Sequence, residues 1–197
     1  MKHLLISVIF TLTLLFSSIP EINSSSWIVL QKDSIEVAYY WDKFPWCKAT
    51  IEIESSIDDI LEHIENINNY QNIFNTVSFS KEYENNIVHI VLDMPGFFAD
   101  RDYVVKFIKY NDNSDIVIEF NSIKDNNVNL NKNYVRLINA AGQWRLKSTN
   151  NKLTKVTYIW NGEMLGNFPS LVLKRAWLKQ GNEVLNNLKD TLKNSGS

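Results

Sequence analysis

A single long amphipathic helix, expected over residues 169–193, is the sequence feature that most constrains the fold. Leucines recur along it every seven residues, and Pro169 suits its first turn. We expect Leu171, Leu178 and Leu185 to form its inner stripe, with the lysines and arginines facing outward. Because such a stripe must be buried, the rest of the chain has to supply an apolar surface that covers it.

The segments before this helix have the pattern of β-strands. Residues 154–160 alternate, with Val156, Tyr158 and Trp160 on one face. A period of two with one apolar face indicates a half-buried strand. Similar patterns or β-branched and aromatic residues predict strands over residues 35–41, 47–54, 76–83, 87–94, 103–110, 115–121, 134–138 and 142–147.

Two short helices are expected among the strands, over residues 57–64 and around residues 67–74. A serine pair before the first helix can cap it, and Asp58 and Asp59 in its first turn favour the helix dipole. The chain has no internal repeat and no linker. We therefore expect one folded domain over residues 27–194.

The composition sets broad limits on function. Apolar residues make up 45% of the 197 residues and charged residues 21%, which is ordinary for a globular protein that builds its own core. The formal net charge of −2 argues against a nucleic-acid partner, which needs clustered positive charge.

The first residues have the layout of a secretory signal peptide. A short basic start is followed by an apolar run over residues 4–16 and then by a serine-rich stretch. The run is shorter than the roughly 20 residues that span a bilayer. We expect a signal peptide over residues 1–24; an uncleaved N-terminal anchor is the alternative. Cys47 is the only cysteine, which excludes an internal disulfide and favours the bacterial periplasm, with an extracellular location as the second option.

Several segments together resemble the START family of lipid-transfer domains. The central one joins an apolar run, the Pro95–Gly96 break, an Asp-Arg-Asp triplet and a strand beginning at Tyr103. The later strands and the glycine- and proline-marked start of the last helix resemble the family as well. One departure is Trp160-Asn161-Gly162-Glu163, where the family often has an Asp-Pro pair; another is the apolar segment after Pro95.

The resemblance implies an α+β helix-grip fold, in which a curved antiparallel sheet wraps a long C-terminal α-helix around an internal apolar cavity. It implies that the protein binds, and can transfer, a lipid or another hydrophobic small molecule. It also implies a monomer that makes transient contact with membrane surfaces. The alternatives are an enzyme similar to the polyketide cyclases and aromatases of the same superfamily, and an interaction module without a cavity.

The candidate ligand-binding residues follow from the same resemblance. Aromatic residues beside the two loops that resemble the gates of the cavity are one group, and apolar residues of the last strand and helix are another. Arg101 and Arg136 lie in apolar, strand-like surroundings, so each needs a partner. They either form structural ion pairs with Asp100, Asp102 or Glu119, or hold a lipid headgroup. The full set is Phe97, Phe98, Arg101, Arg136, Val156, Tyr158, Trp160, Phe168, Leu171 and Leu178.

The sequence gives little support for catalysis. No nucleophile, zinc or phosphate-loop motif is present, and His63 and His89 lack a motif partner. Asp93, Asp100 and Asp102 surround an arginine, which favours ion pairing or capping over metal binding. We therefore expect no enzyme activity, no metal and no cofactor.

Overall fold

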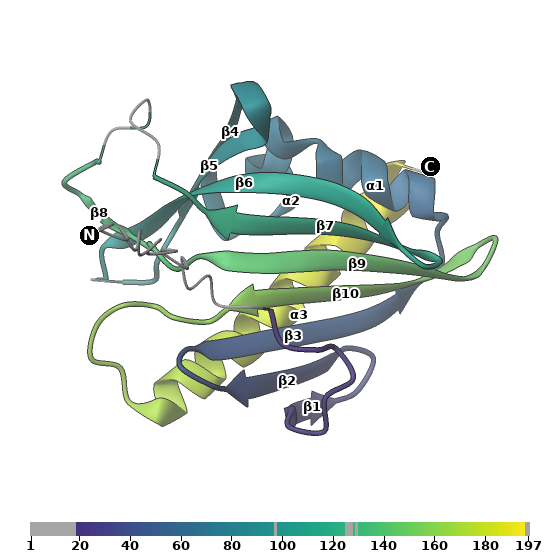
Figure 1. Cartoon of the computed structure of the whole chain (residues 1–197), viewed down its shortest axis with the longest axis horizontal. Coiled ribbons are helices and arrows are strands. Elements are labelled where there is room, and N and C mark those ends of the chain that lie inside the picture. The colour runs from purple at the N-terminus through teal and green to yellow at the C-terminus, as the bar shows by residue number, and fades with distance from the viewer. Residues whose placement is uncertain (1–18, 97, 125–127, 129, 196–197) are drawn as a thin grey trace, which may run out of the picture.

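The computed structural model describes residues 19–96, 98–124, 128 and 130–195 (Figure 1). Ten strands form one sheet, and three α-helices accompany it in this part of the chain. The elements are β1 (Ile28–Lys32), β2 (Glu36–Trp41), β3 (Pro45–Ile53), α1 (Ile57–Glu65), α2 (Tyr70–Ile73), β4 (Val77–Tyr83), β5 (Ile87–Leu92), β6 (Asp100–Asp112), β7 (Asp115–Ser122), β8 (Tyr134–Arg136), β9 (Ala141–Asn150), β10 (Leu153–Asn161) and α3 (Ser170–Ser195), with short 3-10 turns at Ile67–Asn69 and Glu84–Asn86.

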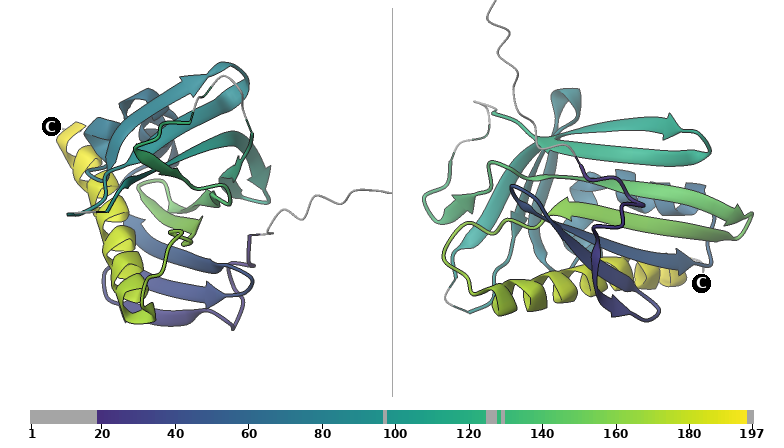
Figure 2. Two further views of the ribbon diagram at one scale, coloured as in Figure 1. Left: turned by 90° about the vertical axis from the view of Figure 1, so that its left-hand side faces the viewer. Right: turned by 60° about the horizontal axis from the view of Figure 1, so that its bottom comes forward.

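The sheet has the strand order β1-β2-β3-β10-β9-β7-β6-β5-β4, and every neighbouring pair in it is antiparallel. The short β8 pairs with β6 in parallel. Figure 2 shows that the sheet curves around α3, which runs across the strands on one side. The α+β helix-grip fold expected from the sequence is confirmed.

Local sequence signals explain several of these elements. The Ser56 hydroxyl accepts a hydrogen bond from the backbone N–H of Asp59 at 3.2 Å and donates one to its carboxylate at 2.6 Å, which caps α1 at the expected place. Between β4 and β5, Asn85 and Asn86 adopt left-handed φ angles of 63° and 59°, which asparagine tolerates better than most residues. The strands predicted over residues 76–83 and 87–94 therefore pair as a hairpin.

The strand β1 is not among the strands predicted from the sequence, which begin at residue 35. It is the edge strand beside β2, and Ile28 and Val29 are half exposed. The strand β3 also begins earlier than predicted, at Pro45. Proline lacks a backbone N–H, so the first position of a strand is one of the few places in a sheet that it can occupy.

The helix α3 buries a different stripe from the one predicted. Its buried residues are Trp177, Gly181, Val184, Leu185 and Leu188. Leu185 is fully buried as expected, Leu178 is only partly buried, and Leu171 is 59% exposed. The expectation that Leu171 faces the sheet is therefore wrong. Seven residues fall about 20° short of two full helical turns, so leucines at this spacing drift around the helix instead of staying on one face.

Gly181 explains which side of α3 approaches the sheet. A Cβ atom on it would lie 3.1 Å from the Cβ of Ala49 and 3.2 Å from the ring of Trp160. The absence of a side chain lets the helix backbone come close to β3 and β10. The Trp177 side chain, one turn earlier, fills the adjoining space and is 1% exposed.

Residues 19–27 lie against the other face of the sheet. Ile19, Ile22 and Trp27 pack against Trp46 and Ile159, which alternate with residues of the main core along β3 and β10. The expected signal peptide falls mostly on residues 1–18, outside the described residues. Within the ranges given above, no helix combines the length and the apolar character needed to cross a membrane.

Candidate functional site

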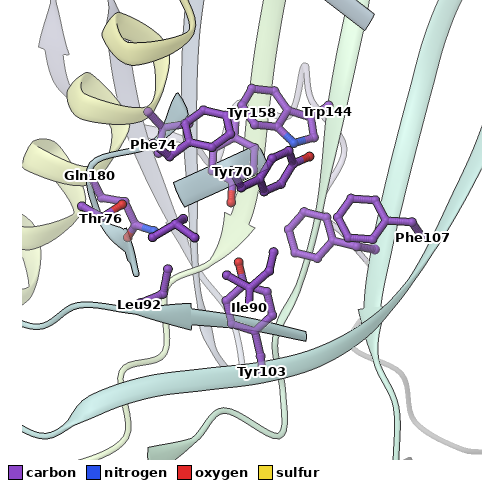
Figure 3. A pocket seen from close by; sticks show the side chains of 13 residues that line it. Tyr70, Phe74, Thr76, Ile90, Leu92, Tyr103, Phe107, Trp144, Tyr158 and Gln180 are labelled. Carbon is purple, nitrogen blue, oxygen red and sulfur yellow. The ribbon is translucent and has the colours of Figure 1, made fainter. Parts of the chain in front are cut away.

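A cavity lies between the sheet and α3 (Figure 3). It consists of two adjoining pockets, each with about 40 Å³ of space that the centre of a water-sized molecule can reach; the larger empty volumes of about 470 and 400 Å³ include the parts that open to solvent. The inner pocket reaches the start of β4, and the outer pocket reaches the loop before α3, which spans residues 162–169. The residues that line both are Leu92, Tyr103, Phe120, Tyr158 and Gln180.

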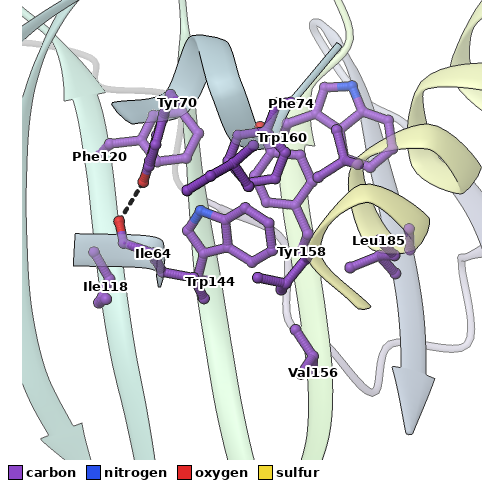
Figure 4. Packing of buried hydrophobic residues seen from close by; sticks show 14 of the residues in the cluster. Ile64, Tyr70, Phe74, Ile118, Phe120, Trp144, Val156, Tyr158, Trp160 and Leu185 are labelled. Carbon is purple, nitrogen blue, oxygen red and sulfur yellow. Dashed lines mark hydrogen bonds between the residues drawn. The ribbon is translucent and has the colours of Figure 1, made fainter. Parts of the chain in front are cut away.

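Stacked aromatic rings form much of the cavity wall (Figure 4). The ring centroids of Trp144 and Tyr158 are 4.3 Å apart, and those of Tyr158 and Trp160 are 5.0 Å apart. On the neighbouring strands, Phe107 stacks on Phe120 at 5.4 Å. The side-chain alternation of β6, β7, β9 and β10 brings these rings to the same face of the sheet. The wall is therefore apolar, as expected for a pocket that binds a hydrophobic molecule.

Arg101 lies at the outer end of the cavity and is 4% exposed. Its Nε donates to the Met164 carbonyl and its Nη2 donates to the Leu165 carbonyl, each at 3.2 Å, and its Nη1 donates to the Ala99 carbonyl. Its guanidinium carbon lies 5.7 Å from the centre of the Phe168 ring. Burial lowers the pKa of Arg101, and the nearby Asp100 carboxylate offsets only part of this effect.

The partners predicted for Arg101 are therefore wrong. It forms no ion pair with a carboxylate in the described part of the chain. Instead, a buried cation on β6 donates to backbone carbonyls of the loop before α3. This arrangement holds the loop closed over the outer pocket.

The same loop has a second attachment at its beginning. The backbone N–H of Gly162 donates to the Pro45 carbonyl at 2.7 Å, and the Trp177 indole donates to the Gly162 carbonyl at 2.9 Å. Further on, Gly166 has a φ of 122°, which favours glycine. Phe168 at the loop end contacts Phe98 of the other predicted gate, with ring centroids 5.4 Å apart. The two gate loops thus meet beside Arg101.

Arg136 lies on the opposite face of β6 from the cavity. Its Nε and Nη2 donate to the two carboxylate oxygens of Asp102 at 2.9 and 2.7 Å. His89 Nε2 lies 2.9 Å from the same carboxylate, which is 1% exposed. Because Asp102 alternates with Tyr103, its side chain points away from the cavity. The ion pair with Asp102 supports a structural role for Arg136. Arg136 does not line either pocket, so the prediction that it contacts a ligand is not supported.

The sequence identified part of the site. Tyr158 and Trp160 line the cavity. Arg101, Phe98 and Phe168 meet at its outer end, whereas Val156 and Leu178 pack in or against the core without lining either pocket. Phe97 lies outside the described residues. The lining residues that sequence reasoning missed include Tyr70, Phe74, Ile90, Tyr103, Phe107, Phe120, Trp144, Gln180 and Val184.

A signal for the missed residues was present in the strand pattern. Tyr103, Val105 and Phe107 share one face of β6, because they alternate with Val104 and Lys106 on the other face. The start of β6 also follows the central segment that resembles the START family. On α3, Gln180 and Val184 lie four residues apart on one face, and Val184 belongs to the buried stripe.

A sheet that grips one long helix around an apolar cavity is the helix-grip fold of START-related lipid-transfer domains. The structure is similar to that of a STAR-related lipid transfer protein from Xanthomonas axonopodis, with a TM-score of 0.75 and 19% identity over 85% of this chain and 99% of the other. It is also similar to human StAR-related lipid transfer protein 5, with a TM-score of 0.74 and 8% identity over 89% and 90% of the two chains.

A more distant similarity connects the chain to an enzyme. The Zhui aromatase/cyclase from a Streptomyces species matches with a TM-score of 0.54 and 12% identity, over 77% of this chain and 95% of the other. No protein-family model and no curated protein matches the sequence. The structural similarities therefore show the fold.

Proposed function

We propose that the protein is a START-like carrier that binds a lipid or another hydrophobic small molecule between the sheet and α3. The observation that supports this most directly is the aromatic cavity beneath the loop before α3, which Arg101 holds in place by hydrogen bonds. Each methylene group that moves from water into such a cavity contributes about 0.8 kcal/mol. Binding of an alkyl or ring system therefore needs no covalent step. All the residues that line the two pockets belong to one chain, so a monomer is sufficient for this function.

Uptake of a ligand requires the loop before α3 to move. The hydrogen bonds from Arg101 to Met164 and Leu165 have to break, and the contact between Phe98 and Phe168 has to open. Gly166 gives the loop a position with wide conformational freedom. We infer that the closed loop retains the ligand and that its opening sets the rate of exchange.

The surface beside this loop is suited to transient contact with an anionic membrane. Phe98, Leu171 and Val172 are 52%, 59% and 45% exposed. Lys174 and Arg175 follow on the next turn of α3, although the chain as a whole carries a net charge of −2. Exposed apolar side chains flanked by basic residues are typical of proteins that dock on anionic lipid surfaces. Docking there would place the gate next to the bilayer.

A cyclase-like enzyme remains the second candidate because of the similarity to the Zhui aromatase/cyclase. General acid–base catalysis would require an ionisable group close to the substrate. Glu163 is the only charged residue among the described residues that line the two pockets, and it accepts a hydrogen bond from Asn139 at 2.7 Å. We therefore favour binding without catalysis.

Export remains a further part of the proposal. The basic start, apolar run and serine-rich stretch of the N-terminal region support it, and the periplasm is the proposed location. Cys47 is a free, buried cysteine, so the fold requires no disulfide in that compartment.

Native mass spectrometry of the purified protein tests the proposal. We expect a bound hydrophobic molecule, or uptake of one from vesicles of mixed lipids. The variant Val184→Phe should reduce occupancy because Val184 lines the inner pocket, whereas Val29→Phe on the edge strand should not. A wild-type protein that stays empty in both settings would support an interaction module without a ligand.

A further inference from the structure

Three hydrogen-bonding groups meet at the junction of the two pockets without a partner. They are the hydroxyls of Tyr103 and Tyr158 and the side-chain amide of Gln180, all of which line both pockets. Figure 3 shows both hydroxyls directed into the cavity from the sheet, with Gln180 reaching it from α3. Within the described part of the chain, none of the three side chains forms a hydrogen bond.

Tyr70 provides a useful contrast. Its ring also lines the inner pocket, but its hydroxyl donates to the Ile64 carbonyl (Figure 4). Buried polar groups in proteins are normally hydrogen-bonded in this way, because an unsatisfied group is costly. Trp160 Nε1 and Asn161 Nδ2, from residues that line the outer pocket, are fully buried without a partner in the described structure. The hydroxyls of Tyr103 and Tyr158 and the amide of Gln180 differ from them, because they are not fully buried and stay accessible from the cavity. The cavity thus holds more hydrogen-bonding groups than its own structure uses.

The surroundings of the three groups disfavour a charged partner. Among the described residues, no charged side chain lines the inner pocket, and Glu163 is the one charged residue that lines the outer pocket. Burial raises the pKa of Tyr103 and of Tyr158, so both phenols are neutral and can donate. Arg101 donates to backbone carbonyls and lines neither pocket. A charged headgroup at the junction would therefore be buried without a counter-ion, which is strongly unfavourable.

We propose that Tyr103, Tyr158 and Gln180 form a neutral hydrogen-bonding subsite, and that the natural ligand is a hydrophobic molecule with an uncharged hydroxyl or carbonyl group that binds there. This inference rests on the proposed ligand-binding function and narrows its ligand class. The stacked rings on either side hold the apolar body, and the subsite fixes the depth at which the polar group sits. A ligand whose only polar group is ionised would lose the subsite and carry a desolvation cost as well.

Three probes of equal chain length test the subsite: myristyl alcohol, myristate and tetradecane. Their affinities are measured through quenching of tryptophan fluorescence, since Trp144 and Trp160 line the cavity, with native mass spectrometry as a second readout. We expect the alcohol to bind at least about tenfold more tightly than the ionised acid. The double variant Tyr103→Phe/Tyr158→Phe should weaken alcohol binding about five- to tenfold and leave tetradecane binding unchanged.

Tyr110→Phe is the matched control, since it removes a phenol that contacts Glu119 on the outside of the sheet. The double variant should melt at or above the wild-type temperature, because neither hydroxyl has a partner in the folded protein. Equal binding of alcohol and acid, an unchanged double variant, or a large loss of stability in it would overturn the subsite while leaving the proposed function intact. Failure of all three probes to bind would contradict both.

Discussion

The Nε atom of Arg101, on β6, lies 3.2 Å from the carbonyl oxygen of Met164, in the loop before α3. The two residues are 63 positions apart in the sequence, and their contact joins the start of β6 to the loop before α3, one of the two loops predicted to gate the cavity. A guanidinium group is suited to this role because its rigid donors can reach several carbonyls at once. We interpret Arg101 as the latch of the gate.

Replacing the latch should loosen the loop. Arg101→Met keeps much of the side-chain length and removes the donors, so the free energy of unfolding should fall by about 1–3 kcal/mol. Ligand exchange, followed by stopped-flow fluorescence, should become faster. Arg175→Met, at an exposed position on α3, should leave the stability unchanged. Slower or unaltered exchange in Arg101→Met would mean that another contact closes the gate.

Two leucines of α3 should respond very differently to the same substitution. Leu185 is fully buried, so Leu185→Asp places an uncompensated charge in the core and should cost several kcal/mol. Leu171 is exposed, so Leu171→Asp should change the stability by no more than about 0.5 kcal/mol. Leu171→Asp should also weaken binding to anionic vesicles in a flotation assay. Similar melting temperatures for the two variants would show that the helix is oriented otherwise.

The single thiol reports whether the core beneath the gate opens. Burial raises the pKa of the Cys47 thiol, and its side chain lies under Gly162 at the start of the gate loop. Because the folded pKa lies above the unfolded value of about 8.5, the contribution of this thiol to the free energy of unfolding should be constant below that pH and fall as the pH rises through it. Alkylation by iodoacetamide should be slow in the wild type and faster in Arg101→Met. Rapid labelling of the native wild type would contradict this burial.

The N-terminal region gives a prediction about maturation. Protein recovered from the periplasm should begin near residue 25, as N-terminal sequencing would show. Ile19 and Ile22, which pack on the outer face of the sheet here, would then be missing from the mature protein. Their loss should lower the melting temperature slightly relative to the full chain. A chain that retains Met1 and sediments with membranes would instead indicate an uncleaved anchor.

The fold was predictable because its main signals are local. The alternation of Val156, Tyr158 and Trp160 places them on the core side of β10, as expected. The Ser56 cap and the asparagine turn before β5 also depend only on neighbouring residues. These patterns and the order of the segments carry the resemblance to the START family, and that resemblance is what indicated the helix-grip fold.

The parts that sequence reasoning missed depend on contacts between distant segments. The partner of Arg101 is a set of backbone carbonyls, which have no signature in the sequence. The buried stripe of α3 depends on where Gly181 lets the helix approach Ala49. The meeting of Tyr103 with Gln180 depends on the curvature of the sheet around α3, which no local pattern encodes.

Photo-crosslinking tests the central claim most directly, since it identifies the residues that contact a bound ligand. The probes are a long-chain alcohol and a fatty acid that each carry a diazirine, with peptide mass spectrometry to locate the label. The proposed function predicts labelling of cavity residues such as Phe120 and Tyr158, and competition by an unlabelled hydrophobic ligand. Labelling confined to the outer face of the sheet, around His89 or Ile159, or labelling that no ligand displaces, would contradict binding between the sheet and α3.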